Sequence, residues 1–301
     1  MLSEYEKRAL AQIHAWKNPR QTWFDTAMAY VNKPLEIAGH AVDRIPGFSE
    51  TCSKATSGIV GLVNDLSQWS VRPDAIIEEL SAISKREITG LDQIPSLDLQ
   101  LVDRAIGWLD TKYEGLALLE GAAAGGTAVV NPLVALAAIP VDLTALLAMS
   151  LRAIGEYGTY CGFDMSSQEE RLFSLNILAF ASSSTDSGKQ AALSHLVKIA
   201  QDVAKKKTWE HLEKSVFVQA CLSIAKAMGI KLTKAKLANV IPVAGAALGG
   251  GFNAYYTDKV CKAAFYLYRE RFLALKSGSQ VIEVTVEPAK SDIWTPEEAS
   301  A

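Results

Sequence analysis

Two stretches of this 301-residue chain, residues 121–141 and 237–257, contain no charged side chain over 21 residues each. A run of about 20 uncharged residues is long enough to cross a lipid bilayer as a helix. Both stretches are rich in glycine and alanine, and each contains a Gly-x-x-x-Gly motif. The glycines of these motifs are Gly121, Gly125, Gly245 and Gly249. Because glycines at this spacing let two helices approach closely, the stretches predict tightly packed helices, either in lipid or in a dense protein core.

The composition favours a globular protein over one that crosses the membrane many times. Hydrophobic residues make up 49% of the chain and charged residues 21%, which is an ordinary globular balance. The net charge of −3 provides no general attraction to nucleic acid, so no nucleic-acid partner is predicted. The first residues do not read as a signal peptide, so we expect the chain in the cytoplasm or at the cytoplasmic face of the inner membrane.

Hydrophobic residues recur at helical spacing along nearly the whole chain, which predicts an all-α fold, a multi-helix bundle. The predicted helices cover residues 5–16, 23–31, 49–69, 73–85, 97–119, 143–160, 189–206, 209–228 and 243–276. A further helix is predicted to start at a capping box formed by Ser166 and Glu169 and to end near residue 181. Asn131 and Pro132 predict a tight turn that divides the first apolar stretch into a helical hairpin.

We interpret residues 1–276 as one helical domain with a central Gly/Ala-rich core. In this core, residues 121–151 are predicted to pack on residues 237–257. Residues 277–301 are predicted to form a flexible acidic tail. The strand-like pattern at residues 281–287 lies in this tail and has no predicted partner strand.

Asp142 follows the first apolar stretch, and a carboxylate buried there needs a hydrogen-bond donor. One hypothesis is a functional polar core that Asp142 forms with Asn253, Arg152 and Glu156. The other, and the more common role, is that Asp142 caps the first turn of the helix over residues 143–160. The sequence leaves both readings open.

Aromatic residues flank the apolar stretches, where the interfacial belt of a membrane helix would place them. They are Trp108, Tyr113, Tyr157, Tyr160, Tyr255 and Tyr256. Lys231, Lys234 and Lys236 precede the second stretch and either attract anionic lipid or form the solvated face of a helix. Against insertion, Asp142 would cost about 2.5–3.5 kcal/mol at the membrane centre. We therefore favour a soluble or peripherally bound hairpin over an inserted one.

Motifs of the common enzyme classes are absent from the sequence. The four histidines lack metal-binding spacing, and no P-loop, nucleophile elbow or dinucleotide-binding motif occurs. We therefore predict no metal and no cofactor, and assign no catalytic residue. The four cysteines are scattered and are expected to be free thiols. A helical hydrolase is an alternative, with Asp142, Glu156, Asn253 or Cys161 around an internal polar pocket.

Two groups of residues form a combined pattern. The first is Gly121, Gly125, Ile139-Pro140, Asp142, Tyr157-Gly158, Gly162-Phe163-Asp164 and Glu169-Glu170-Arg171. The second is Lys236, Ile241-Pro242, Gly245, Gly249, Asn253, Tyr268 and Arg271-Phe272-Leu273. Together with Tyr5-Glu6 and Trp16, this pattern resembles the EcsC family of bacterial proteins over about residues 5–275. The resemblance implies a membrane-associated protein of a family named from an ABC-transporter operon. The family has no established activity, so the resemblance implies no catalytic residue.

From the residues and the resemblance together, we expect a protein that binds membrane lipid or a membrane-protein partner, such as a transporter. The binding is expected to use the Gly-rich apolar hairpins. One alternative is a membrane-perturbing effector whose hairpins insert when triggered, and the other is the helical hydrolase.

Overall fold

The computed structural model describes residues 2–17, 71–128, 132–183 and 245–278, and single positions at 54, 57, 58, 61, 62, 192, 221, 224, 225, 227 and 228. For residues 121–128, 132–140 and 245–252, only the backbone is described. Apart from the single positions, the helices predicted at 23–31, 49–69, 189–206 and 209–228 lie outside the described residues. The predicted tail, from residue 279 onward, also lies outside them.

The described residues form seven α-helices and one 3₁₀ helix, η2, which the sequence did not predict. In chain order they are α1 (Glu4–Lys17), α4 (Pro73–Ser84), η2 (Leu91–Ser96), α5 (Leu99–Ile106), α6 (Leu109–Ala128), α7 (Pro132–Tyr160), α8 (Gln168–Ser182) and α11 (Gly245–Ser277). No strand occurs among the described residues, so the prediction of an all-α fold is confirmed for them.

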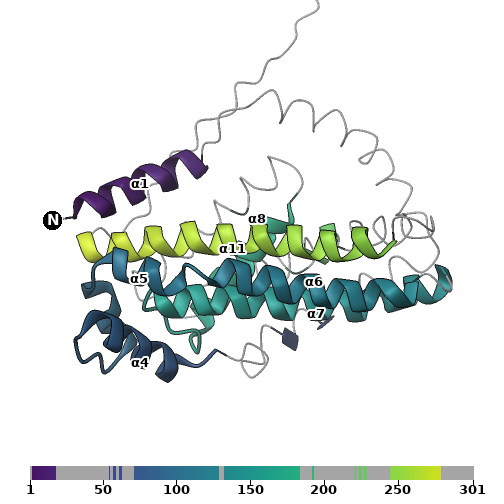
Figure 1. The fold of residues 1–301 in the computed structure, drawn as a ribbon, viewed down its shortest axis with the longest axis horizontal. Coiled ribbons are helices and arrows are strands. Elements are labelled where there is room, and N and C mark those ends of the chain that lie inside the picture. Colours follow the sequence, from purple (N-terminus) through teal and green to yellow (C-terminus); the bar gives the residue numbers. More distant parts are fainter. Residues whose placement is uncertain are drawn as a thin grey trace, which may run out of the picture.

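Three long helices form the centre of the molecule (Figure 1). α6 and α7 run antiparallel, and α11 lies along α6 in the opposite direction, with its most extensive contact there. The uncharged ends of these three helices, residues 121–128, 132–140 and 245–252, therefore meet at one end of the bundle, which we call the Gly-rich end. At the opposite end, α1 packs on α11, while α4 packs on α5 and α7.

The helix predicted over residues 97–119 is in fact two helices, α5 and α6, so that prediction was wrong. The side chain of Asp98 caps α5 by accepting a hydrogen bond from the backbone N–H of Gln100 at 2.9 Å. Gly107 ends α5, and Trp108 separates it from α6. Val102 of α5 and Tyr113 of α6 are both fully buried, so both helices contribute to the core.

α7 is continuous from Pro132 to Tyr160, with Pro132 at the first helical position, where proline is favoured. Asn131, at the predicted turn, lies outside the described residues. Asp142 lies in the interior of α7 and cannot cap a helix that starts ten residues earlier. The capping hypothesis for Asp142 was therefore wrong.

Other helix predictions are confirmed to within one or two residues at each end. They are α1, α4, α8 and α11. α4 starts at Pro73, as predicted, and ends at Lys85, which adopts the left-handed conformation (φ 54°).

Candidate functional site

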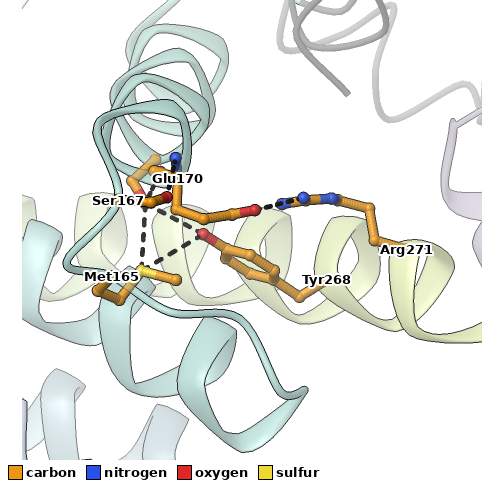
Figure 2. Close-up of polar contacts among 6 residues, drawn as sticks. Met165, Ser167, Glu170, Tyr268 and Arg271 are labelled. Atoms are coloured by element: carbon orange, nitrogen blue, oxygen red, sulfur yellow. Dashed lines mark hydrogen bonds and ion pairs between the residues drawn. The ribbon is translucent and has the colours of Figure 1, made fainter. Parts of the chain in front are cut away.

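Residues that carry the sequence pattern converge on a buried centre between α7, α8 and α11. Gly158 belongs to α7, Phe163 to the segment after it, Glu170 to α8, and Tyr268 and Arg271 to α11. The side chains of the other four residues, Phe163, Glu170, Tyr268 and Arg271, are buried. Figure 2 shows Glu170 and Arg271 directed toward one another, with Tyr268 and Met165 beside them.

The start of α8 places Glu170 in this centre. Ser167 is the N-cap, and its Oγ accepts a hydrogen bond from the backbone N–H of Glu170 at 3.1 Å. The predicted capping box was therefore one residue out of register, because Ser166 instead donates to Asp164 at 2.7 Å. The carboxylate of Glu170 accepts two hydrogen bonds from the Arg271 guanidinium, at 2.6 and 2.5 Å. A paired geometry of this kind is the strongest form of carboxylate–arginine contact.

Aromatic rings close the centre around Arg271. Its guanidinium carbon lies 3.9 Å from the Phe163 ring centroid and 4.2 Å from that of Phe173. Gly158 is required beside it, because an added Cβ would lie 2.8 Å from Cζ of Tyr268. The centre is thus enclosed, with its charges paired internally, and it fastens α8 to α11. We interpret it as a structural centre.

A second polar cluster lies between α6 and α7 and is more accessible. Nζ of Lys112 donates to both carboxylate oxygens of Glu156, at 3.0 and 2.7 Å. Arg152, one turn before Glu156, approaches the same carboxylate at 3.7 Å. The side chains of Lys112 and Arg152 remain 24% and 42% exposed. Lys112 also lies over the ring of Trp108, 4.9 Å from its centroid.

The four residues of the predicted polar core do not share one site. Arg152 and Glu156 are brought together, whereas Asp142 lies about 15 Å from Arg152 along the axis of α7, at about 1.5 Å per residue. Asp142 instead lies near Glu120, whose pKa is raised first by burial and then by the Asp142 carboxylate. Asn253 is buried on α11. A hydrolase pocket that includes both Asp142 and Glu156 would therefore have to extend along α7 from one residue to the other.

Cys161 does not have the properties of a nucleophile. The thiol is buried, and this burial raises its pKa, with a further contribution from the Asp103 carboxylate. A protonated, inaccessible thiol is unreactive. Within the described part of the chain, no group of three or more His, Cys, Asp or Glu side chains is placed to hold a metal ion.

Large hydrophobic side chains are exposed next to the Gly-rich end, on the side toward the middle of the bundle. They are Leu116, Leu118 and Leu119 of α6, Val141 of α7 and Tyr255 of α11, with exposed fractions of 43–70%. We call these five residues the apolar collar. The other two exposed large hydrophobic residues of the described chain, Trp108 and Leu275, lie toward the opposite end of the bundle.

The collar differs from the aromatic belt that the sequence predicted. Tyr113, Tyr157, Tyr160 and Tyr256 are buried, so this part of the prediction was wrong, and only Trp108 and Tyr255 are exposed. The aliphatic residues of the collar were missed, although their proximity to the charge-free run was visible in the sequence. The surroundings of Gly121, Gly125, Gly245 and Gly249, and the whole of Lys231, Lys234 and Lys236, lie outside what the structure describes.

Among the helices in the described residues, none has both the length and the apolar character needed to cross a membrane. A model of the EcsC protein family matches residues 7–273. The chain is also similar to the uncharacterized protein YdbA of Bacillus subtilis, with 23% identity over 268 residues, which covers 87% of this chain and 90% of the relative. No solved structure matches the chain. This chain belongs to the EcsC protein family.

Proposed function

We propose that this EcsC-family chain binds the surface of a membrane through the Gly-rich end of its bundle, with the apolar collar at the level of the lipid headgroups. The observation that carries the proposal is the apolar collar, in which three helices expose large hydrophobic side chains at the same end. Leu116 and Leu119 lie on one side of α6 and Leu118 on another, because successive helical residues are about 100° apart. Exposure on several sides suits insertion of the end of a bundle.

The dimensions of the Gly-rich end agree with shallow insertion. Residues 121–128 and 132–140 form eight- and nine-residue helical segments without a charged side chain. Their length is about 12–14 Å at 1.5 Å per residue, less than half of the roughly 30 Å hydrocarbon core. Backbone hydrogen bonds within these segments are internal to the helices, which suits the lipid interior, whereas the last turn of α6 and the first turn of α7 leave backbone groups without an intrahelical partner. The Gly-rich end can therefore enter one leaflet without crossing the bilayer.

Energetics support the role of the collar. A large hydrophobic side chain contributes about 1.5–3 kcal/mol when it is transferred fully out of water. The five collar residues are 43–70% exposed in the structure. Transfer of each into the membrane would therefore still gain a substantial part of this free energy. A total on the order of 5 kcal/mol is enough for reversible binding with a dissociation constant below the millimolar range.

Tyr255 and Lys259 form a pair suited to the lipid headgroup region. Nζ of Lys259 lies 4.6 Å from the centroid of the exposed Tyr255 ring. Tyrosine rings favour the membrane interface, and a lysine can extend its charge toward water. This pair would limit how deeply α11 enters. The predicted contribution of Lys231, Lys234 and Lys236 to binding of anionic lipid remains a prediction.

Flotation of the full chain with lipid vesicles tests the proposal. Vesicles of phosphatidylcholine, with and without phosphatidylglycerol, separate apolar binding from attraction by lysines. We expect the wild-type chain to float with both, and Leu119→Ser with Val141→Ser to lower the partition constant for the vesicles about tenfold, a loss of about 1.4 kcal/mol. Leu275→Ser is the control, since Leu275 is also more than half exposed but lies at the opposite end of the bundle.

Two results would contradict membrane-surface binding. One is a wild-type chain that stays with the aqueous fraction, and the other is an equal loss in the Leu275→Ser control. A chain that sediments with cell membranes but ignores protein-free vesicles would indicate a membrane-protein partner. Release of a trapped dye in the same assay would favour the membrane-perturbing effector.

A further inference from the structure

The N-terminal helix α1 contacts the rest of the molecule through three polar side-chain contacts and a narrow apolar face. Nζ of Lys17 contacts the Glu270 carboxylate at 2.5 Å, with both side chains less than 10% exposed. Near the other end of α1, Glu6 pairs with Lys276 at 2.5 Å. Both partners belong to the C-terminal half of α11, along which α1 lies (Figure 1).

A third polar contact joins α1 to α5 and α11. The hydroxyl of Tyr5 donates to Oδ2 of Asp103 at 2.7 Å, and Nη2 of Arg269 donates to the same oxygen at 2.8 Å. Each of the three contacts therefore links a side chain of α1 to a charged group of the bundle.

The apolar part of this contact is small. Ala9 and Ile13 are the fully buried hydrophobic residues of α1, and Tyr5, Leu10 and Trp16 are partly buried against the core. The Trp16 ring lies 4.9 Å from that of Tyr266 and 5.5 Å from that of Phe180, centroid to centroid. In contrast, most of α8 is buried between α7 and α11. Since hydrophobic burial is the main stabilising term in folding, α1 is bound less strongly than the helices of the bundle.

The contact also leaves buried polar atoms unpaired. Nε and Nη1 of Arg269 and Oδ1 of Asp103 have no hydrogen-bond partner in the part of the chain that the structure describes. Each buried polar atom without a partner is unfavourable. Water can reach these atoms when α1 moves away, so opening relieves this penalty. The buried ion pairs gain little by comparison, because desolvation offsets much of their attraction.

We propose that α1 is a releasable strap: it leaves α11 as a unit while α6, α7, α8 and α11 remain packed. Opening of this kind is the expected behaviour of an element with few buried apolar contacts. It uncovers Tyr266 together with the charged residues Arg269, Glu270 and Lys276 of α11. The strap thereby controls access to the C-terminal half of α11, at the end of the bundle opposite to the apolar collar. The proposal does not depend on membrane binding.

Thiol modification of the full chain tests the strap. Ala9→Cys places a thiol at a buried position of α1, and the buried Cys161 and Cys261 of the bundle serve as internal references. After treatment with iodoacetamide, mass spectrometry gives the rate at each site. We expect position 9 to react at least about 10-fold faster than both references, because only the strap has to open.

Charge variants identify the cause of the opening. Lys17→Met, made in the Ala9→Cys background, should raise the rate at position 9 severalfold and leave Cys161 and Cys261 unchanged. Lys7→Met is the matched control, because Lys7 pairs within α1 with the exposed Glu4 and should have no effect. Equal rates at position 9, Cys161 and Cys261 would overturn the proposal, since α1 would then leave only on global unfolding.

Hydrogen exchange of the wild-type chain is a control for the Ala9→Cys substitution, which could itself weaken the contact of α1. Amides of α1 should exchange faster than those of α8 under native conditions. Equal protection of the two helices would also overturn the strap, whatever the vesicle assay shows.

Discussion

Glu170 and Arg271 are 101 residues apart in the sequence and form a buried ion pair with two hydrogen bonds, which joins the first turn of α8 to the last third of α11. Arg271 is held between the rings of Phe163 and Phe173, so its charge has little access to solvent. This enclosure makes Glu170 the essential partner of the arginine.

Removal of either partner should therefore be strongly destabilising. We expect Glu170→Gln or Arg271→Met to lower the free energy of unfolding by about 3–5 kcal/mol, because one buried charge remains uncompensated. Arg271→Lys should not restore stability, since an ammonium cannot donate two parallel hydrogen bonds. Urea unfolding measures these changes. If Glu170→Gln costs as little as the exposed variant Lys7→Met, the pair has no structural role.

Two glycines of neighbouring helices should respond in opposite ways to alanine. Gly158→Ala places Cβ 2.6 Å from Cε of Met165 and 2.8 Å from Cζ of Tyr268, so we expect a loss of about 1–3 kcal/mol. At Gly115 an added Cβ meets nothing within 4 Å. Gly115→Ala should therefore be neutral or stabilise α6 by up to about 1 kcal/mol. Thermal unfolding of both variants is the test, and equal effects would refute the close packing at Gly158.

The register of the α8 cap can be tested with two adjacent serines. Ser167→Ala removes the side-chain acceptor of the Glu170 N–H and should cost about 1 kcal/mol. Ser166→Ala removes a contact with the exposed Asp164, so we expect a change of roughly 0.5 kcal/mol or less. Chemical denaturation distinguishes the two. A larger loss for Ser166→Ala would support the capping box predicted from the sequence.

Local patterns were sufficient to predict most helices but not how they meet. Periodicity located α4 and α11, because each has its own apolar spacing and end signals. The sequence predicted the cap of α8 at Ser166 and Glu169, whereas the observed cap is one residue later, and the contact of Glu170 with Arg271, far away in the chain, accompanies it. A contact between residues that are far apart in the chain cannot be predicted from the local sequence around either residue.

The same distinction applies to the candidate site. Arg152 and Glu156 were predicted as members of one polar core with Asp142 and Asn253, and they meet because they are one helical turn apart, whereas Lys112 was missed because it comes from another helix, 44 residues away from Glu156. The tyrosine belt failed for a related reason. Tyr160 donates to Glu79 at 2.5 Å, and the Tyr256 hydroxyl lies 2.7 Å from Ser182, so these rings have polar partners inside the protein.

Glu120 should make stability depend on pH. Burial and the neighbouring Asp142 carboxylate raise its pKa above the ordinary value of 4.5, so the folded chain binds a proton there more readily than the unfolded chain. The charged carboxylate is therefore unfavourable above the raised pKa, and the penalty fades as the pH falls through that pKa toward 4.5. Glu120→Gln should stabilise the fold by roughly 0.5 kcal/mol at pH 7, as expected for relief of a like-charge contact.

The advantage of Glu120→Gln should disappear below pH 4.5, where the wild-type carboxyl is protonated in both states. Thermal unfolding of wild type and variant across pH 4–8 gives this difference directly. Glu78→Gln, on the exposed face of α4, is the matched control for the loss of one negative charge. A Glu120→Gln effect that stays constant across this range would show that shape, and not charge, determines the stability at this position.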